Sequence, residues 1–515
     1  MSYSIVKSGA LFGIESFIVD VETDASGGLP GFEMVGMLNS EVKEARERVK
    51  VALKNSGISL PPLRICVNVS PANVRKCGTA FDLPIAISLL CALGVLEEEK
   101  TEGIVFLGEL GLDGEIRFVN GVLPIALTAR ESGMKKVITP KENAFEGASV
   151  EGIDVIGLST LTEVIDYLNM PEEERNETYP PVQFSQGNIS AGENTGNGPD
   201  FADVKGQQGM RRAAEVCAAG FHHLLMIGPP GAGKTMIAKR IPSILPPLSF
   251  DESIEVSKIY SISGLLKENG SLIVNRPFRN PHHTISEQAL AGGGRIPKPG
   301  VVSLSHKGVL FLDEAVHFSH AALEVLRQPM EDRKVEIARS YGTFTYPADF
   351  MLVAAINPCP CGYFPDRNKC NCTPAQIKKY LSAISGPILD RIDVCIEAPR
   401  MEIGELTGGE KGESSAKMRS RIQVARQMQE ERFKNLGIRF NSEMNSAQTA
   451  VYCELAPKEK SFMEKAFKSL SLSARAYHKI LRVSRTIADL DGAAKIEEKH
   501  LAEAICYRSV DRNYW

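Results

Sequence analysis

Hydrophobic residues recur along the chain with spacings that predict both helices and strands. Residues 41–57 have apolar side chains at positions 42, 45, 49, 52 and 53, which predicts an amphipathic helix ending near Gly57. Residues 83–96 form a longer apolar run, too short to cross a bilayer, and we expect a buried helix there. Short apolar runs predict three strands near the N-terminus. They are residues 104–110, 135–140 and 150–158.

The middle of the chain alternates helical patterns with short apolar runs. The predicted strands are residues 223–228, 308–314 and 349–357. This alternation is typical of a parallel sheet covered by helices, so we expect an α/β fold. Beyond residue 400 the patterns are helical, at residues 422–434, 462–470 and 477–490.

These patterns divide the chain into four parts. We expect an N-terminal α/β domain over residues 1–168, a linker over 169–200, a central α/β domain over 201–398 and a helical C-terminal domain over 399–515. The linker is rich in Pro, Gly, Asn and Glu and has too few aliphatic residues to order itself. A second loop, residues 404–415, precedes the C-terminal helices.

Composition narrows the class of protein. The 515 residues are 43% hydrophobic and 24% charged, as in soluble globular proteins. The net charge of −4 excludes a globally basic nucleic-acid binder but leaves room for a local basic surface. We find no secretory signal and no membrane span, and therefore expect a cytoplasmic protein whose eleven cysteines are reduced.

A phosphate-binding loop follows the first central strand. Its residues are Gly228, Pro229, Pro230, Gly231, Ala232, Gly233, Lys234 and Thr235. The spacing fits the P-loop pattern, in which backbone amides surround phosphate oxygens, the lysine reaches the β- and γ-phosphates and the threonine binds Mg²⁺. A chance glycine turn is the alternative, and the flanking strand and helix argue against it. The loop predicts ATP and Mg²⁺ as ligands.

Polar residues also end the next two central strands. Asp313 suits the Mg²⁺ shell, and Glu314 suits orientation and deprotonation of the attacking water. Asn357 lies where an α/β sheet places ligand contacts, and we assign it to the water or the γ-phosphate. The alternatives are a solvated strand end for the two carboxylates and a simple turn before Pro358 for the asparagine.

Four of the cysteines are close in sequence. Cys359, Cys361, Cys370 and Cys372 form two Cys-x-Cys pairs, and four thiolates can complete a tetrahedral zinc site. The spacing is tighter than the common Cys-x₂-Cys, and reduced loop thiols without metal are the alternative. We expect a structural role for any metal, because four protein ligands leave no open position.

Several stretches together resemble the AAA+ magnesium-chelatase-like family, and among its members the YifB/ComM competence-type proteins. They are residues 200–207, 228–235, 308–314, Asn357, 384–393 and 473–490, and the resemblance covers nearly the whole chain. It implies a homo-hexameric ring with ATP bound between subunits. It also implies that Arg391 is the finger reaching a neighbour's γ-phosphate and that Arg475 is the second sensor arginine. From the residues alone, surface arginines in ion pairs are the favoured alternative for both positions.

The N-terminal block resembles the Lon-protease-type domain, which has a ribosomal-S5-like α/β fold, over residues 77–94 and 107–133. Ala80 and Phe81 stand near the position of that family's nucleophilic serine, and the matching stretch, residues 119–126, has no lysine. Without nucleophile and base, peptide hydrolysis has no route. We expect a non-proteolytic scaffold or DNA-path domain, with Lys76 solvated.

Two segments have features suited to touching a polymer inside a ring. Residues 286–300 carry Arg295 and Lys298, and residues 333–349 read as a hairpin with Arg339 and Tyr341 at its tip. An ordinary solvated hairpin is the alternative.

Together these expectations describe an ATPase that works as a ring motor on single-stranded or branched DNA. The resemblance implies a helicase or translocase that drives branch migration in recombination during natural transformation. A chelatase-type motor subunit that remodels a partner protein is the alternative. An ATP-dependent protease and a nucleotide-gated scaffold are weaker ones.

Overall fold

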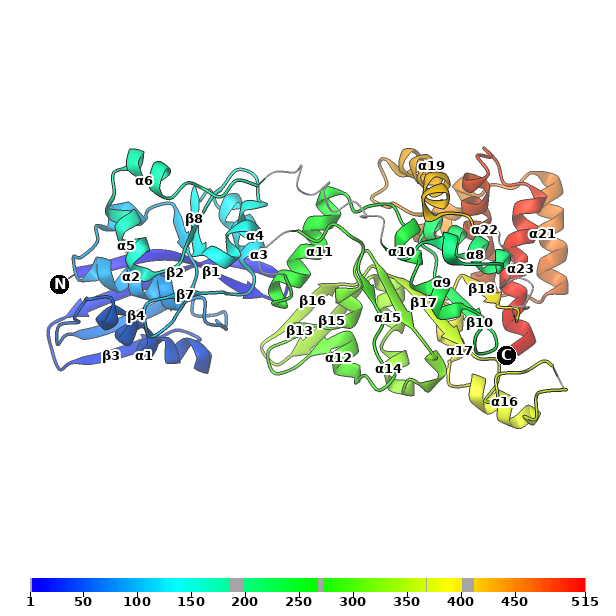
Figure 1. Cartoon of the computed structure of the whole chain (residues 1–515), viewed down its shortest axis with the longest axis horizontal. Helices are drawn as coiled ribbons and strands as arrows, with labels where there is room; N and C mark the ends of the chain where they lie inside the picture. The colour runs from blue at the N-terminus through cyan, green and yellow to red at the C-terminus, as the bar shows by residue number, and fades with distance from the viewer. Residues whose placement is uncertain (1, 185–197, 267–271, 367, 401–411, 515) are drawn as a thin grey trace. The chain divides into compact units, whose positions relative to one another are not determined.

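The structure, a computed structural model, describes residues 2–184, 198–266, 272–366, 368–400 and 412–514 (Figure 1). The chain divides into two compact units. The first comprises Met1–Gly192, Phe250–Val274 and Ala338–Tyr346, and the second comprises Glu193–Ser249, Asn275–Ile337 and Pro347–Trp515. No helix in the described part of the chain has the length and apolar character that a membrane-spanning segment needs.

The first unit is built on a seven-stranded sheet with the order β3-β4-β2-β1-β5-β8-β9. Its strands are β1 (Ser2–Phe12), β2 (Glu15–Ser26), β3 (Gly31–Val35), β4 (Arg64–Ser70), β5 (Ile104–Phe106), β8 (Lys136–Pro140) and β9 (Asp154–Leu158). The antiparallel pairs β1–β2 and β2–β4 lie on one side, and β5, β8 and β9 continue from β1 in parallel. The sheet therefore contains both antiparallel and parallel strand pairs, and with its helices the unit has the expected α/β fold.

Helices cover both faces of this sheet. Along β5, Ile104 and Phe106 belong to one hydrophobic core, while Val105 and its neighbour Leu107 belong to another. The first core includes α1 (Ser40–Asn55), α2 (Asp82–Ala92) and α5 (Leu161–Asn169), and the second includes α3 (Val122–Glu131) and α4 (Ala144–Ala148). A strand buried on both faces reads as a continuous apolar run, which is why β5 was recognisable in the sequence.

Most local predictions for this unit are confirmed. The helices α1 and α2 match the helices predicted over residues 41–57 and 83–96, and α2 is buried along its whole length. The strand predicted over residues 104–110 is broken: β5 ends at Phe106, and the two-residue strand β6 (Glu109–Leu110) pairs instead with β7 (Ile116–Arg117).

Two expectations for this unit differ from the structure. Lys76 is buried rather than solvated, because its ammonium donates a hydrogen bond to the carbonyl of Pro71 while its aliphatic stem packs inside. Within the expected linker, Glu172–Thr178 form the helix α6, and Arg175 ties it to the carbonyls of Leu168 and Met170. Residues 185–197 of the linker, and residues 401–411 of the expected second loop, lie outside the described residues.

The second unit has a five-stranded parallel sheet with the order β11-β14-β17-β10-β18. Its strands are β10 (Leu224–Ile227), β11 (Phe278–Arg279), β14 (Val309–Leu312), β17 (Met351–Ile356) and β18 (Val394–Glu397). The three central strands predicted from sequence are β10, β14 and β17. Of these five strands, β10 comes first in the sequence, yet it lies between β17 and β18, which come last. The strand order therefore reverses beside β10. In an open α/β sheet this is where a crevice forms at the carboxyl ends.

The C-terminal helices share one hydrophobic core with this sheet and with α8 (Gln208–Gly220). They are α19 (Ser415–Phe433), α20 (Ser446–Tyr452), α21 (Pro457–Ser469), α22 (Ala474–Leu490) and α23 (Glu498–Tyr514). The helical pattern predicted beyond residue 400 is thus confirmed where the chain is described. The shared core makes these helices part of the unit that carries the sheet.

The expected hairpin over residues 333–349 is present. It consists of β15 (Lys334–Arg339) and β16 (Gly342–Pro347), which form a two-stranded sheet. Its tip belongs to the first unit, where Phe344 packs against Phe12 with ring centroids 4.5 Å apart, and the guanidinium of Arg75 lies 5.4 Å from the ring of Tyr341. The glycine-rich segment forms α12 (Glu287–Ala291) and a short pair of strands, β12 (Gly292–Gly293) and β13 (Lys298–Pro299).

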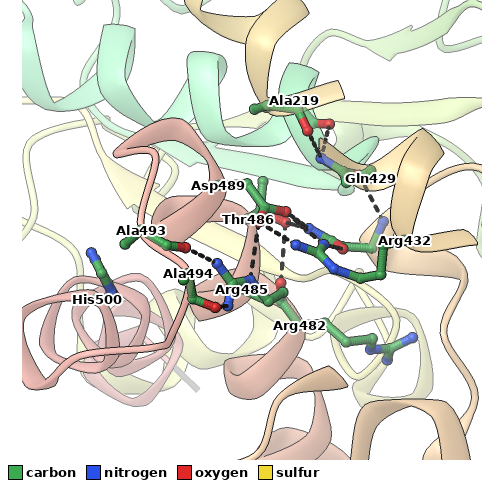
Figure 2. Close-up of polar contacts among 12 residues, drawn as sticks. Ala219, Gln429, Arg432, Arg482, Arg485, Thr486, Asp489, Ala493, Ala494 and His500 are labelled. Atoms are coloured by element: carbon green, nitrogen blue, oxygen red, sulfur yellow. Dashed lines mark hydrogen bonds and ion pairs between the residues drawn. The ribbon is translucent and has the colours of Figure 1, made fainter. Parts of the chain in front are cut away.

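A buried ion network joins the C-terminal helices (Figure 2). The fully buried carboxylate of Asp489 in α22 accepts hydrogen bonds from Arg432 of α19, at 2.6 and 2.8 Å, and from Arg485 at 3.0 Å. The side-chain amide of Asn441 adds a bond of 2.8 Å. In the same helix, the hydroxyl of Thr486 lies 2.8 Å from Nε2 of His222, which precedes β10 of the sheet. Two guanidinium groups thus depend on one carboxylate for their charge balance.

We expect Asp489→Asn to destabilise this unit by about 3–5 kcal/mol, because it leaves the buried Arg485 and the partly buried Arg432 without their counter-charge. Thermal unfolding of the full-length protein, followed by circular dichroism, measures the effect. Glu430→Gln removes an exposed partner of Arg426 and is the matched control, with an expected change below about 1 kcal/mol. Equal melting temperatures for Asp489→Asn and the wild type would contradict this assignment.

Candidate nucleotide-binding site

Three polar strand ends meet at one edge of the second sheet. The strands β14, β17 and β10 are direct neighbours and run parallel, with Leu312 paired to Ala354 and Ile227 paired to Ile356. Their carboxyl ends therefore lie side by side. The phosphate loop, the pair Asp313–Glu314 and Asn357 follow these three ends, so the fold brings the predicted residues to one place.

The backbone of the phosphate loop needs its glycines. Gly231 and Gly233 have φ angles of +79° and +83°, in the left-handed region that only glycine adopts without strain. At Gly228, a Cβ atom would lie 2.5 Å from the carbonyl oxygen of Ala398. The helix α9 (Lys234–Ala238) begins directly after Gly233. This loop geometry directs backbone amides toward the site, as phosphate binding requires.

Lys234 is buried at the centre of the site. Its ammonium donates hydrogen bonds to the carbonyls of Gly228 at 2.6 Å and Pro229 at 3.0 Å, and to Oδ1 of Asn357 at 3.2 Å. These acceptors are all neutral. Burial lowers the pKa of Lys234 to about 8, and the charges of Asp313 and Glu314 only partly oppose this effect. A bound phosphate would supply the negative charge that the ammonium lacks.

Thr235 and Asp313 provide oxygen ligands suited to Mg²⁺. The hydroxyl of Thr235 donates to Oδ2 of Asp313 at 2.9 Å, so the two predicted ligands are already adjacent. A hydroxyl and a carboxylate beside a phosphate site form the donor set that this hard cation prefers. When bound, Mg²⁺ neutralises phosphate charge and orients the phosphate oxygens.

Glu314 has an unusual backbone conformation. Its φ angle is +49°, left-handed for a residue that has a Cβ, and its side chain is exposed. Strain of this kind costs about 1–3 kcal/mol and is concentrated at functional sites. The backbone amide of Glu314 donates to Oδ1 of Asp313 at 3.1 Å, which fixes the turn.

Arg391 and Arg475 lie together, apart from the phosphate loop. Both guanidinium groups bind the carboxylate of Glu331, and the Arg391 bond measures 2.5 Å. All three residues line a cavity of about 630 Å³, and no residue of the phosphate loop lines it. The structure thus separates the six predicted catalytic residues into two groups, Lys234, Asp313, Glu314 and Asn357 in one and the two arginines in the other. Sequence reasoning missed Glu331, since an acidic residue in a helix is usually only solvated.

The segment carrying Arg391 is held from the C-terminal helices. Lys479 of α22 donates to the carbonyl of Ile392 and contacts Oδ1 of Asp393, both at 3.1 Å. Arg508 of α23 donates to the same carbonyl at 3.0 Å. The carboxyl of Asp393 is buried, and the cation of Lys479 holds its pKa well below its usual range despite that burial. These positioning residues had no sequence signal, because their partners are far away in the chain.

The four predicted metal ligands form one cluster. The sulfur of Cys359 lies 3.3 Å from that of Cys361 and 3.8 Å from that of Cys370, and the last two sulfurs are 3.6 Å apart. The sulfur of Cys372 completes a group whose ligand atoms all lie within 4.8 Å of one another. A disulfide needs about 2.0 Å between sulfurs. A tetrahedral zinc with bonds of about 2.3 Å places its ligands about 3.8 Å apart, so the spacing fits a metal.

Comparisons with known proteins show which families and relatives the chain resembles. Three family models match: "Magnesium chelatase, subunit ChlI" over residues 200–406, "Subunit ChlI of Mg-chelatase" over 21–143 and "Magnesium chelatase, subunit ChlI C-terminal" over 412–508. The chain is 43% identical to the competence protein ComM of Haemophilus influenzae, over 99% of this chain and 98% of ComM.

The chain belongs to the ComM/YifB family of magnesium-chelatase-like AAA+ proteins. This membership supports ATPase activity, with ATP and Mg²⁺ as ligands, and it accounts for the phosphate loop and the parallel sheet. Two further relatives, from outside this family, match only part of the chain. Lon protease 2 of Bacillus subtilis is 27% identical over 33% of this chain and 32% of its own length. The DNA repair protein RadA of Streptococcus pyogenes is 35% identical over 19% of this chain and 21% of its own length.

In this ComM/YifB-family chain the Lon-like block has no peptidase pair at the expected place. Ala80 offers no nucleophile, and Phe81 is buried just before α2. The next residue, Asp82, is buried and binds Arg48 at 2.6 Å, so its carboxylate has a structural partner.

The lowered pKa of Lys234 predicts how ATP binding depends on pH. Bound phosphate raises this pKa, because a nearby anion favours the charged ammonium, so binding takes up a proton once the free lysine is partly neutral. We therefore expect the affinity for ATP to fall as the pH rises from about 8 toward 10. Titration calorimetry in buffers of different ionisation enthalpy measures the proton uptake.

The exposed Lys239, the residue directly after helix α9, provides the control for this prediction. Lys239→Met leaves the buried ammonium in place and should keep the pH dependence. A constant affinity across this pH range, with no proton uptake by the wild type, would contradict the account of Lys234.

Proposed function

We propose that this chain is a cytoplasmic ATP-driven ring motor that acts on DNA, with helicase or translocase activity in branch migration. The observation that carries the proposal is the separation of the catalytic residues into two groups. Lys234, Thr235, Asp313 and Asn357 form a phosphate site, while Arg391 and Arg475 lie together elsewhere on the same unit. A site divided in this way becomes complete when one subunit presents its arginines to the phosphate site of the next.

The two arginines have the chemistry that such an interface needs. In phosphoryl transfer, negative charge is spread over the oxygens of the γ-phosphate, and a guanidinium placed there stabilises it. In the single chain the two guanidinium groups share the one carboxylate of Glu331, whose side chain is 40% exposed, so it balances only half of their charge. A neighbour's triphosphate would compete with this carboxylate. A homo-hexameric ring, as the family resemblance implies, places one such interface between each pair of subunits.

The hairpin β15–β16 supports DNA as the polymer. Its exposed Arg339 suits a phosphate backbone, and Tyr341 offers a ring for stacking, already flanked by the guanidinium of Arg75. Arg295 and Lys298 are exposed on the second predicted segment. In a ring each cation repeats in every subunit, which concentrates positive charge despite the net charge of −4. The names of ComM, a competence protein, and RadA, a DNA repair protein, agree with this substrate class.

A chelatase-type motor that remodels a partner protein is the second candidate. The three matching family models favour it, since each is described as a magnesium chelatase subunit. The two candidates differ in what stimulates ATP hydrolysis, which is DNA for the first and a partner protein for the second.

We also propose Zn²⁺ as the ion of the four-cysteine cluster, in a structural role. The sulfur spacing fits tetrahedral coordination, and four thiolates are a soft ligand set that selects zinc over Mg²⁺. The same four ligands leave no position for a reacting water. ATP hydrolysis therefore takes place at the phosphate site.

The test of the DNA proposal is the ATPase rate of the full-length protein with and without single-stranded and branched DNA. We expect DNA to raise the rate, and Arg339→Ala to need about tenfold more DNA for half-maximal stimulation, because a backbone contact is lost. Arg64→Ala removes another exposed arginine, outside the hairpin, and should leave the stimulation unchanged. Hydrolysis that no DNA stimulates, in any of the three proteins, would contradict a DNA motor.

A further inference from the structure

The four-cysteine loop, residues 359–372, lies against the phosphate loop. Gly362, between Cys361 and Cys370, is buried and has a φ angle of +83°. A Cβ atom at this position would lie 2.6 Å from Cδ of Pro230, in the phosphate loop. Only glycine combines this backbone conformation with so close an approach. The two loops therefore fit together at a point where neither has room to move toward the other.

The N-terminal end of the cysteine loop reaches the nucleotide site, and the helix after its C-terminal end contacts the segment that follows Glu314. Asn357, two residues before Cys359, accepts the hydrogen bond from Lys234. After Cys372, a capping box formed by Thr373 and Gln376 starts the helix α16 (Pro374–Leu381). Tyr380 of this helix packs edge-on against His317, with ring centroids 6.1 Å apart. His317 lies three residues after Glu314 in the sequence. A displacement of the cysteine loop would therefore shift the groups around Lys234, the phosphate loop and the turn that carries Glu314.

The loop lacks regular secondary structure and is held by short turns and by its thiols. The turns include a hydrogen bond from the amide of Cys370 to the carbonyl of Asp366 at 2.8 Å. Between Cys359 and Cys372 the described residues form neither helix nor strand, and the buried ones are Cys359, Gly362 and Cys370. The amide of Phe364 donates to the sulfur of Cys359 at 3.4 Å, a contact typical of backbone around a metal-bound thiolate. Metal binding orders loops of this kind, and metal loss disorders them.

We propose that a zinc ion on Cys359, Cys361, Cys370 and Cys372 clamps Gly362 against Pro230, so that the phosphate loop binds ATP tightly only while the metal is present. The clamp rests on the proposed function, because its effect is exerted on the ATP site. It gives the cluster a task beyond local stability. The cluster sets the position of the loop that surrounds the phosphates.

The test compares metal content and ATP binding in the full-length protein. Inductively coupled plasma mass spectrometry measures zinc per chain, and a fluorescent ATP analogue measures affinity. We expect one zinc per chain in the wild type, and we expect Cys370→Ser to lose the metal and to bind ATP at least about tenfold more weakly. Gly362→Ala should keep the zinc, because all four thiols remain, and still lose affinity through its clash with Pro230.

Cys77→Ser, in the first unit, is the matched control and should change neither quantity. Wild-type protein that takes up no zinc, even when zinc is supplied, would overturn the metal site. Normal ATP binding by metal-free Cys370→Ser, or by Gly362→Ala, would overturn the clamp and leave the proposed function standing. Zinc-loaded wild type that binds no ATP would overturn both, and helical circular dichroism of each variant separates these results from general unfolding.

Discussion

The ammonium of Lys234 is buried among neutral oxygens, and the rest of the site follows from this arrangement. Two carbonyls of its own loop and the amide oxygen of Asn357 satisfy its hydrogen bonds but not its charge. A buried cation that contacts no anion directly is costly, which is why burial lowers the pKa of this lysine even though Asp313 and Glu314 partly oppose the effect. An arriving phosphate relieves the cost. The parallel order of β14, β17 and β10 places all the groups that handle that phosphate at the same edge.

The two arginines, Arg391 and Arg475, also carry charge that their protein partner balances only in part. Arg391 and Arg475 share one acceptor, Glu331, and each guanidinium in this arrangement gains by exchanging half a carboxylate for a full phosphate charge. Their position depends on the C-terminal helices. Lys479 and Arg508 hold the carbonyl of Ile392, beside Arg391, and the Asp489 network holds α22 against α19. The helical part of the chain thus supports the group that, on our proposal, a neighbouring subunit uses.

Sequence predicted the parts of the site that depend on local pattern. The phosphate loop, Asp313 and Asn357 each follow an apolar run that forms a strand, and parallel strands bring their ends together. The hairpin at residues 334–347 and the cysteine cluster were also readable, because a turn or a repeated spacing marks them. Pattern failed where distant partners decide the outcome. Glu331 gains its meaning from two arginines at positions 391 and 475, and Lys76 is buried because it finds the carbonyl of Pro71.

The most direct test of the central claim, that adjacent subunits complete each other's ATP sites, mixes two variants that are inactive alone. Arg391→Ala keeps a phosphate site but offers no finger, and Glu314→Gln offers the finger but has lost its own catalytic carboxylate. Random mixing at equal amounts creates a complete site at about a quarter of the interfaces of a ring. Our account predicts that the mixture hydrolyses ATP at a rate well above the mean of the two separate variants. A mixture no faster than that mean would contradict it.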